Sequence, residues 1–255
     1  MTGAGNHTWL VLGETTTLVD AGVGSPSHLD AIGAALDTAG RRLEQVVVTH
    51  SHPDHASGAP AIADRWPAAR FLKVPWPEAD VRHPVGWRHV GEGDVLMAGD
   101  VQLEVVATPG HAPDHFCLWH ASSRTLFGGD LLIEGATVVV PGTRGGSLRD
   151  YLASLERIKA LDPAQVLPAH GPAIDEPVAL IERYIAHRHA REAEILDAIT
   201  RGATTIDAVV AAVYPQISGP LRRVALETVY AHVRKLADEG RLEASFGAEG
   251  SSRRG

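Results

Sequence analysis

The chain has little of several features that define specialised classes of protein. It contains one cysteine, Cys117, so no internal disulfide can form and a disulfide-stabilised scaffold is excluded. No stretch approaches the roughly 18 consecutive apolar residues that a membrane-spanning helix needs. The first residues also lack the basic start and the long apolar run of a secretory signal peptide. We therefore expect a soluble, cytoplasmic protein with no membrane partner.

Basic charge is scarce as well. The formal net charge is −8, which repels nucleic-acid phosphates at long range. DNA is therefore not expected as a partner, although a local basic groove for RNA stays open. Histidine, in contrast, is abundant, with 14 copies in 255 residues. Imidazole is the commonest metal ligand among side chains, so the spacing of these histidines decides whether the excess has a function.

The first 175 residues alternate short apolar runs with helical stretches, a pattern typical of an α/β fold. Helices are expected at residues 26–40, 57–66 and 148–161. Strands are expected at residues 8–13, 16–22, 45–50, 69–74, 101–110, 116–121, 125–130, 136–140 and 165–171. We predict that residues 1–175 form one α/β domain.

The strand signals stop after this domain. Residues 176–202 are predicted to form a long connecting helix, with Pro177 in the first turn and Gly202 beyond the end. A short helix capped by Thr204 or Thr205, a helix from 219 to 239 and a strand or wing over 241–245 follow. This order is the outline of a winged helix. We predict a winged-helix-like domain over 203–246 and a flexible tail over 247–255.

The densest group of reactive side chains is the segment His50-Ser51-His52-Pro53-Asp54-His55, which directly follows an apolar run. In an extended segment residues i and i+2 point the same way, so His50 and His52 can bind one metal ion. After the bend that Pro53 favours, Asp54 and His55 can face a second ion.

Three further candidates close apolar runs in the same way, namely His111, Asp130 and His170. Strand ends gather at one edge of a sheet, so residues far apart in the sequence can converge there. Five imidazoles and two carboxylates are too many for one tetrahedral zinc ion. They suit two ions that share a carboxylate.

The motif and these three residues resemble the metallo-β-lactamase fold superfamily. The resemblance implies an αββα four-layer sandwich. It places His50, His52 and His111 on one metal ion, Asp54, His55 and His170 on the other, and Asp130 between them. It also implies two zinc ions, with manganese or iron also possible, that provide a bridging hydroxide to attack an ester, thioester, lactone or phosphodiester. We expect Asp54 to act in catalysis as a proton acceptor or shuttle.

Within this superfamily the chain is similar, over nearly its whole length, to the β-lactamase-like protein 2 group of metallo-hydrolases. The segments that carry this likeness are residues 145–172, 184–199 with the motif from His187 to Glu192, and 232–243. That likeness implies either single-stranded RNA, as for an endoribonuclease, or a small acyl substrate. Two further hypotheses are a glyoxalase II-like thioesterase and a metal-containing DNA-binding regulator. A homodimer through the helical region is an additional expectation from the likeness.

Several residues near the motif have simpler interpretations. We expect Asp20 to be a structural support and Cys117 to be packed in a strand. His115 is either a partner of a metal ligand or an exposed loop residue. Six basic residues could face an anionic substrate, although a solvated helix surface suits most of them better: Arg144, Arg149, Arg222, Arg223, Arg234 and Lys235. The winged helix is expected to form a wall of the active-site cleft or an interface rather than to read DNA.

Overall fold

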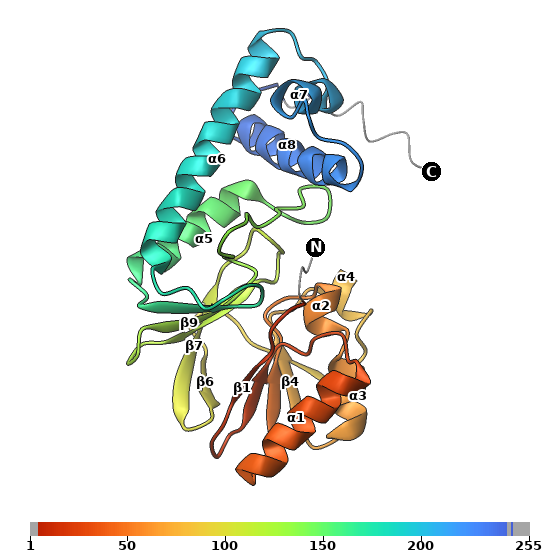
Figure 1. The fold of residues 1–255 in the computed structure, drawn as a ribbon, viewed down its shortest axis with the longest axis vertical. Coiled ribbons are helices and arrows are strands. Elements are labelled where there is room, and N and C mark those ends of the chain that lie inside the picture. Colours follow the sequence, from red (N-terminus) through yellow and green to blue (C-terminus); the bar gives the residue numbers. More distant parts are fainter. Residues whose placement is uncertain (1–4, 244–245, 247–255) are drawn as a thin grey trace.

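The computed structural model describes residues 5–243 and 246, which form two sheets and a helical C-terminal part (Figure 1). The first sheet has the strand order β1-β2-β3-β4-β5. Strand β1 pairs antiparallel with β2, and the other neighbours are parallel. The strands are β1 (Trp9–Val11), β2 (Thr17–Val19), β3 (Gln45–Val47), β4 (Arg70–Lys73) and β5 (Trp87–His89).

The second sheet has the order β10-β9-β8-β7-β6. Its strands are β6 (Val95–Ala98), β7 (Val101–Ala107), β8 (Phe116–His120), β9 (Thr125–Gly129) and β10 (Gln165–Pro168). Strands β6 to β9 form an antiparallel meander, and β10 is parallel to β9. Strands β7, β9 and β10 therefore run in the same direction, and their carboxyl ends meet at one edge.

Apolar side chains fill three layers. Helices α1 (Pro26–Ala39) and α3 (Ala59–Arg65) cover the outer face of the first sheet. Residues such as Val47 and Phe116 pack between the two sheets. Helices α5 (Leu148–Ala160) and α6 (Pro177–Thr200) cover the outer face of the second sheet (Figure 1). The order helix, sheet, sheet, helix is the expected αββα sandwich.

Local signals explain where the principal helices begin and end. The Ser25 side chain accepts a hydrogen bond from the backbone N–H of His28 and so caps α1, and Gly40 ends that helix with a φ of 60°. Ser147 caps α5 in the same way. The short helices α2 (Pro53–Ala56) and α4 (Pro77–Asp80) each start at a proline, whose fixed φ suits a first helical position.

The C-terminal helices form their own small core. Ile195 of α6 packs with residues of α7 (Ile206–Val213) and α8 (Pro220–Asp238), including Val209 and Val229. Helix α8 also reaches back to the first domain, where its Glu227 accepts hydrogen bonds from the backbone and side chain of Thr143. Within the described residues, no helix has the length and apolar character needed to cross a membrane.

Some expectations differ from the structure. Residues 136–140 form a loop and not a strand, because the two buried residues, Val138 and Val140, are covered by helices without a neighbouring strand to pair with. Strands β5 and β6 and helices α2 and α4 were not expected. Residues 241–243 form no strand, while residues 244–245 and the tail 247–255 lie outside the described residues.

Candidate metal centre

Three histidine rings converge at the edge where the strands end. His50 follows β3, His52 lies directly before α2, and His111 lies in the loop after β7. The Nδ1 atom of His52 lies 3.0 Å from Nε2 of His50 and 2.8 Å from Nε2 of His111. One ring nitrogen cannot donate a proton to both neighbours. The distances between these nitrogens are instead close to the roughly 3.3 Å that separates two ligand atoms on a tetrahedral zinc ion.

A second group lies beside the first. Asp54 and His55 belong to α2, and His170 follows β10. An oxygen of Asp54, Oδ2, lies 3.4 Å from Nε2 of His170 and 3.7 Å from Nε2 of His55. The potential ligand atoms of these three residues all lie within 4.8 Å of one another. Because α2 begins at Pro53, the chain turns immediately after His52 and brings Asp54 and His55 to the second group.

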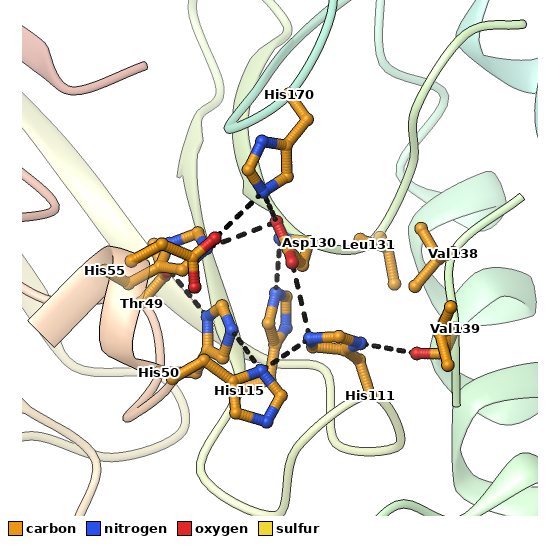
Figure 2. Close-up of polar contacts among 12 residues, drawn as sticks. Thr49, His50, His55, His111, His115, Asp130, Leu131, Val138, Val139 and His170 are labelled. Atoms are coloured by element: carbon orange, nitrogen blue, oxygen red, sulfur yellow. Dashed lines mark hydrogen bonds and ion pairs between the residues drawn. The ribbon is translucent and has the colours of Figure 1, made fainter. Parts of the chain in front are cut away.

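Asp130 lies between the two groups (Figure 2). Its Oδ2 atom is 3.3 Å from Nε2 of His111, in the first group. Its Oδ1 atom is 3.4 Å from Nε2 of His55 and 3.3 Å from Nε2 of His170, in the second group. One carboxylate therefore faces both groups, with a different oxygen toward each.

Hydrogen bonds on the far side of each ring orient these histidines. The Nδ1–H of His111 donates to the Val139 carbonyl over 2.7 Å, and that of His170 donates to the Gly5 carbonyl over 3.0 Å. His55 donates from Nδ1 to Asp20 over 2.8 Å. A neutral ring that donates from Nδ1 leaves Nε2 bare, so each ring can present a lone pair to the centre.

Burial and charge set the protonation of the centre. Burial holds the pKa of His50 well below its ordinary value and lowers the pKa of His52 to about 3. Burial also lowers the pKa of His111. For His55, burial acts in the same direction, but the carboxylates of Asp20 and Asp130 outweigh it and raise the pKa. Neutral rings suit metal binding, and at His55 a cation would replace a proton.

The residues fit a pair of divalent ions. Nε2 of His55 and Oδ1 of Asp130 are buried and have no hydrogen-bond partner among the described residues. Burial raises the pKa of Asp130, but His55, His111 and His170 outweigh burial and hold it well below the usual range, so the carboxylate stays ionised. Buried polar atoms that lack a hydrogen bond are costly unless something compensates them. Two cations that share Asp130 would provide that compensation.

A layer of polar residues supports the ligands. Asp20 accepts from the backbone N–H of Thr49 over 2.8 Å as well as from His55. The Thr49 hydroxyl lies 3.2 Å from Nδ1 of His50. His115 is buried and lies beside Asp130, as Figure 2 shows, so the expectation of an exposed loop residue is wrong. Asp20 has the structural role that its sequence position predicted.

Two glycines allow the backbone to approach this layer. A Cβ atom at Gly110 would lie 2.3 Å from the Cα atom of Tyr151 in α5, and one at Gly129 would lie 2.7 Å from Nε2 of His115. Both glycines also have positive φ values, 137° and 48°. Glycine is therefore required directly before His111 and Asp130, where any side chain would collide with its neighbours.

A cavity of about 510 Å³ opens at the two groups. One side carries polar ligands, including His52, Asp54 and Asp130. The other side is mainly apolar, and the lining there includes Leu132, Ile133, Val138, Val139, Pro141 and Val224. Val224 belongs to α8, so the C-terminal part forms a wall of the cavity, as expected. Arg144, one of the six basic residues considered for an anionic substrate, also lines the cavity, and its side chain is 71% exposed.

The structure thus brings all seven predicted side chains to one place. Cys117 is buried in β8, and burial raises the pKa of its thiol to about 12, which agrees with a packing role. Sequence reasoning missed the backbone carbonyls of Gly5 and Val139 and the side chain of Asn6, which donates to the carbonyl of Asp54. A backbone carbonyl occurs at every position, so no residue type signals such a role.

Comparisons with known families agree with this geometry. Residues 1–170 match the model of the metallo-beta-lactamase superfamily, and residues 205–246 match that of the beta-lactamase associated winged helix domain. A beta-lactamase-like protein 2 homolog from Caenorhabditis elegans is 33% identical over 245 residues, covering 94% of this chain and 81% of the relative.

Two further similarities add detail. A protein from a Cryptosporiopsis species, named atrochrysone carboxyl ACP thioesterase, is 25% identical over 93% of this chain and 76% of its own. The crystal structure of a metallo-beta-lactamase family protein from Thermus thermophilus superposes with a TM-score of 0.74 at 23% identity, over 92% of this chain and 89% of that one. This likeness supports the fold alone.

The two family models and the relative from Caenorhabditis elegans show the family. The chain belongs to the metallo-beta-lactamase superfamily, as a hydrolase with a C-terminal winged-helix domain.

Proposed function

We propose that this hydrolase works with two metal ions, one held by His50, His52 and His111 and the other by Asp54, His55 and His170. The observation that carries the proposal is the carboxylate of Asp130, whose two oxygens face the two groups separately. Mixed nitrogen and oxygen ligands suit zinc, and manganese and iron accept the same donor set.

When bound, such ions lower the pKa of water toward neutrality and stabilise the negative charge that develops on the substrate. The chain itself supplies the orientation and the proton transfer. Burial raises the pKa of Asp54, but its contact with His170 outweighs burial and keeps the carboxyl ionised. Because Asp54 also lines the cavity, we propose that it accepts a proton during turnover and returns it to the leaving group.

The cavity favours a small acyl substrate. Its apolar wall suits the hydrocarbon part of a carboxylic acid derivative, and its volume is in the range of ordinary small-molecule sites. Single-stranded RNA sites use aromatic platforms and several cations. Among the described residues that line the cavity, Arg144 is the single lysine or arginine and none is Phe, Tyr or Trp. We therefore propose an ester, thioester or lactone as the substrate. The thioesterase name of one relative supports this choice.

A substrate panel tests the proposal. Zinc-loaded protein is assayed with an aliphatic thioester, the matching oxygen ester, a lactone and a fluorescent single-stranded RNA. We expect hydrolysis of at least one acyl substrate. In the Asp130→Ala variant the rate of that hydrolysis should fall by a factor of about 100 or more, because the proposed shared ligand is absent. Cleavage of RNA without acyl hydrolysis would contradict the substrate class. Binding of DNA at physiological salt without any hydrolysis would contradict the enzymatic proposal.

We also propose a cytoplasmic location and a homodimer formed through the helical region, and we retain 1–175, 176–202 and 203–246 as the units of the chain. Cell fractionation tests the location, light scattering tests the dimer, and limited proteolysis tests the boundaries at residues 175 and 203.

A further inference from the structure

A short segment near the start of the chain lies along the loop that carries His170. We call residues 5–9 the N-terminal strap. The backbone N–H of His7 donates to the carbonyl of Ala169 over 2.7 Å, and a ring nitrogen of His7 contacts the carbonyl of Gly171 over 2.8 Å. Trp9 donates from its indole N–H to the carbonyl of Pro168 over 3.3 Å. The strap therefore holds both sides of the His170 loop.

Two contacts of the strap reach the second group of ligands directly. The carbonyl of Gly5 accepts from Nδ1–H of His170 over 3.0 Å, which turns Nε2 toward the centre. The side-chain amide of Asn6 donates to the carbonyl of Asp54, on α2. The strap thus bridges the two elements, α2 and the loop after β10, that must keep their relative position for Asp54 and His170 to meet.

The first group is held in another way. Nδ1 of His50 contacts Thr49, and Nδ1–H of His111 donates to Val139, so neither of these orienting contacts involves the strap. The second group therefore depends on contacts from a separate piece of chain that does not orient His50 or His111.

We propose that the strap positions Asp54 and His170. It thereby sets the affinity of the metal ion bound by the second group of ligands, without changing the affinity of the ion bound by the first group. The inference rests on the proposed two-metal function. Without the strap, the His170 loop and α2 would lose their shared contacts, and the freedom gained would have to be lost again when an ion binds. Partners that orient metal ligands typically contribute about 10- to 100-fold in metal affinity.

The test compares two strap variants. In Asn6→Ala/His7→Ala the side-chain contacts with Asp54 and Gly171 are removed. Thr8→Val is the matched control, because the Thr8 hydroxyl contacts Nε2 of His28 on α1 at 2.8 Å and not a residue of either ligand group. Zinc is titrated into each metal-free protein against a competing chelator, which resolves the affinities of the first and second ions independently of activity.

We expect the double variant to bind the second ion about 10- to 100-fold more weakly and the first ion as tightly as the unchanged protein. The affinity of the first ion shows that the variant is folded. Thr8→Val should bind both ions normally. An unchanged second affinity, or an equal loss of both, would overturn the role of the strap. If the unchanged protein bound fewer than two ions, the proposed two-metal function would fail, and the role of the strap with it.

Discussion

The backbone N–H of Asp130 donates a hydrogen bond to Nε2 of His115 over 3.0 Å. The ring of His115 is fixed from its other side, because Nδ1–H donates to the carbonyl of Thr108 over 3.1 Å. His115 is 1% exposed. The residue whose carboxylate faces both groups of ligands is therefore held by a buried ring that does not itself enter the centre.

This relationship predicts the effect of His115→Leu. The apolar side chain leaves the N–H of Asp130 without an acceptor, so we expect kcat/KM on an acyl substrate to fall by about 10- to 100-fold and stability to fall by about 1–3 kcal/mol. Steady-state kinetics and urea unfolding measure the two effects. The matched control is His120→Leu, at the end of the strand β8 that follows His115, because the ring of His120 contacts Ser123 on the surface. Equal activity of the two variants would contradict the role of His115.

A second prediction concerns the glycine before His111. In Gly110→Ala the new Cβ atom would lie 2.3 to 2.4 Å from backbone atoms of Tyr151, and φ at this position is 137°. Helix α5 or the His111 loop must therefore move, and we expect a loss of about 3 kcal/mol or more in unfolding free energy.

Gly91→Ala provides the control, because no atom lies within 4 Å of a Cβ atom at Gly91. Its stability should change by less than about 0.5 kcal/mol. Urea unfolding of both proteins in the metal-free form makes the comparison. A Gly110→Ala protein as stable as Gly91→Ala would show that α5 does not pack directly against Gly110.

A third prediction concerns the wall that α8 contributes to the cavity. Val224→Arg places a long charged side chain against the apolar lining. We expect kcat/KM for a long-chain acyl ester to fall by about tenfold or more, while an acetyl ester is hydrolysed almost normally. Leu221→Arg, one turn earlier on α8 and already 51% exposed, is the control. An equal loss for both esters would indicate a structural effect rather than a limit on chain length.

A fourth prediction follows from the buried pair of Glu192 on α6 and Lys235 on α8. The Nζ atom of Lys235 lies 2.6 Å from Oε2 of Glu192. Burial raises the pKa of Glu192, but hydrogen bonds from Lys235 and Arg241 outweigh burial and lower it below the ordinary value of 4.5. A lowered carboxyl pKa contributes stability that is present above 4.5 and is lost as pH falls through the folded pKa.

Glu192→Gln should therefore lower stability by about 1–3 kcal/mol at neutral pH, and the difference from the unchanged protein should shrink in acid. Urea midpoints measured at neutral pH and at a pH below the lowered, folded pKa of Glu192 provide the comparison. Glu194→Gln serves as the control, because Glu194 lies on the same helix and pairs with Arg191 but is itself 54% exposed. A deficit that stayed constant with pH would mean that the charge of Glu192 is not the cause.

The sequence predicted that the seven candidate ligands lie together, because they follow apolar strand segments that end at one edge. Asp130 comes immediately after β9, and His170 comes two residues after the end of β10. The parallel direction of these strands then brings the two side chains together. The contacts that orient the ligands were less predictable. Asn6 reaches Asp54 across 48 positions of the chain, and nothing in the local sequence marks that contact.

The same limit applies to the fold. The run Ala136–Val140 has the β-branched residues of a strand, yet Val138 and Val139 use their carbonyls to accept hydrogen bonds from Arg188 and His111. Burial selects the same apolar residues in a loop and in a strand, so the composition of the run was misleading. Conversely, β5 is short and has two exposed residues out of three, which leaves no apolar run to detect.

The most direct test of the two-ion centre is anomalous X-ray diffraction at the zinc absorption edge, from crystals of zinc-loaded protein. Two peaks are expected about 3.5–4 Å apart, one among His50, His52 and His111 and the other among Asp54, His55 and His170, with Asp130 between them. A single peak, or peaks away from these seven residues, would contradict the assignment of a two-metal hydrolase.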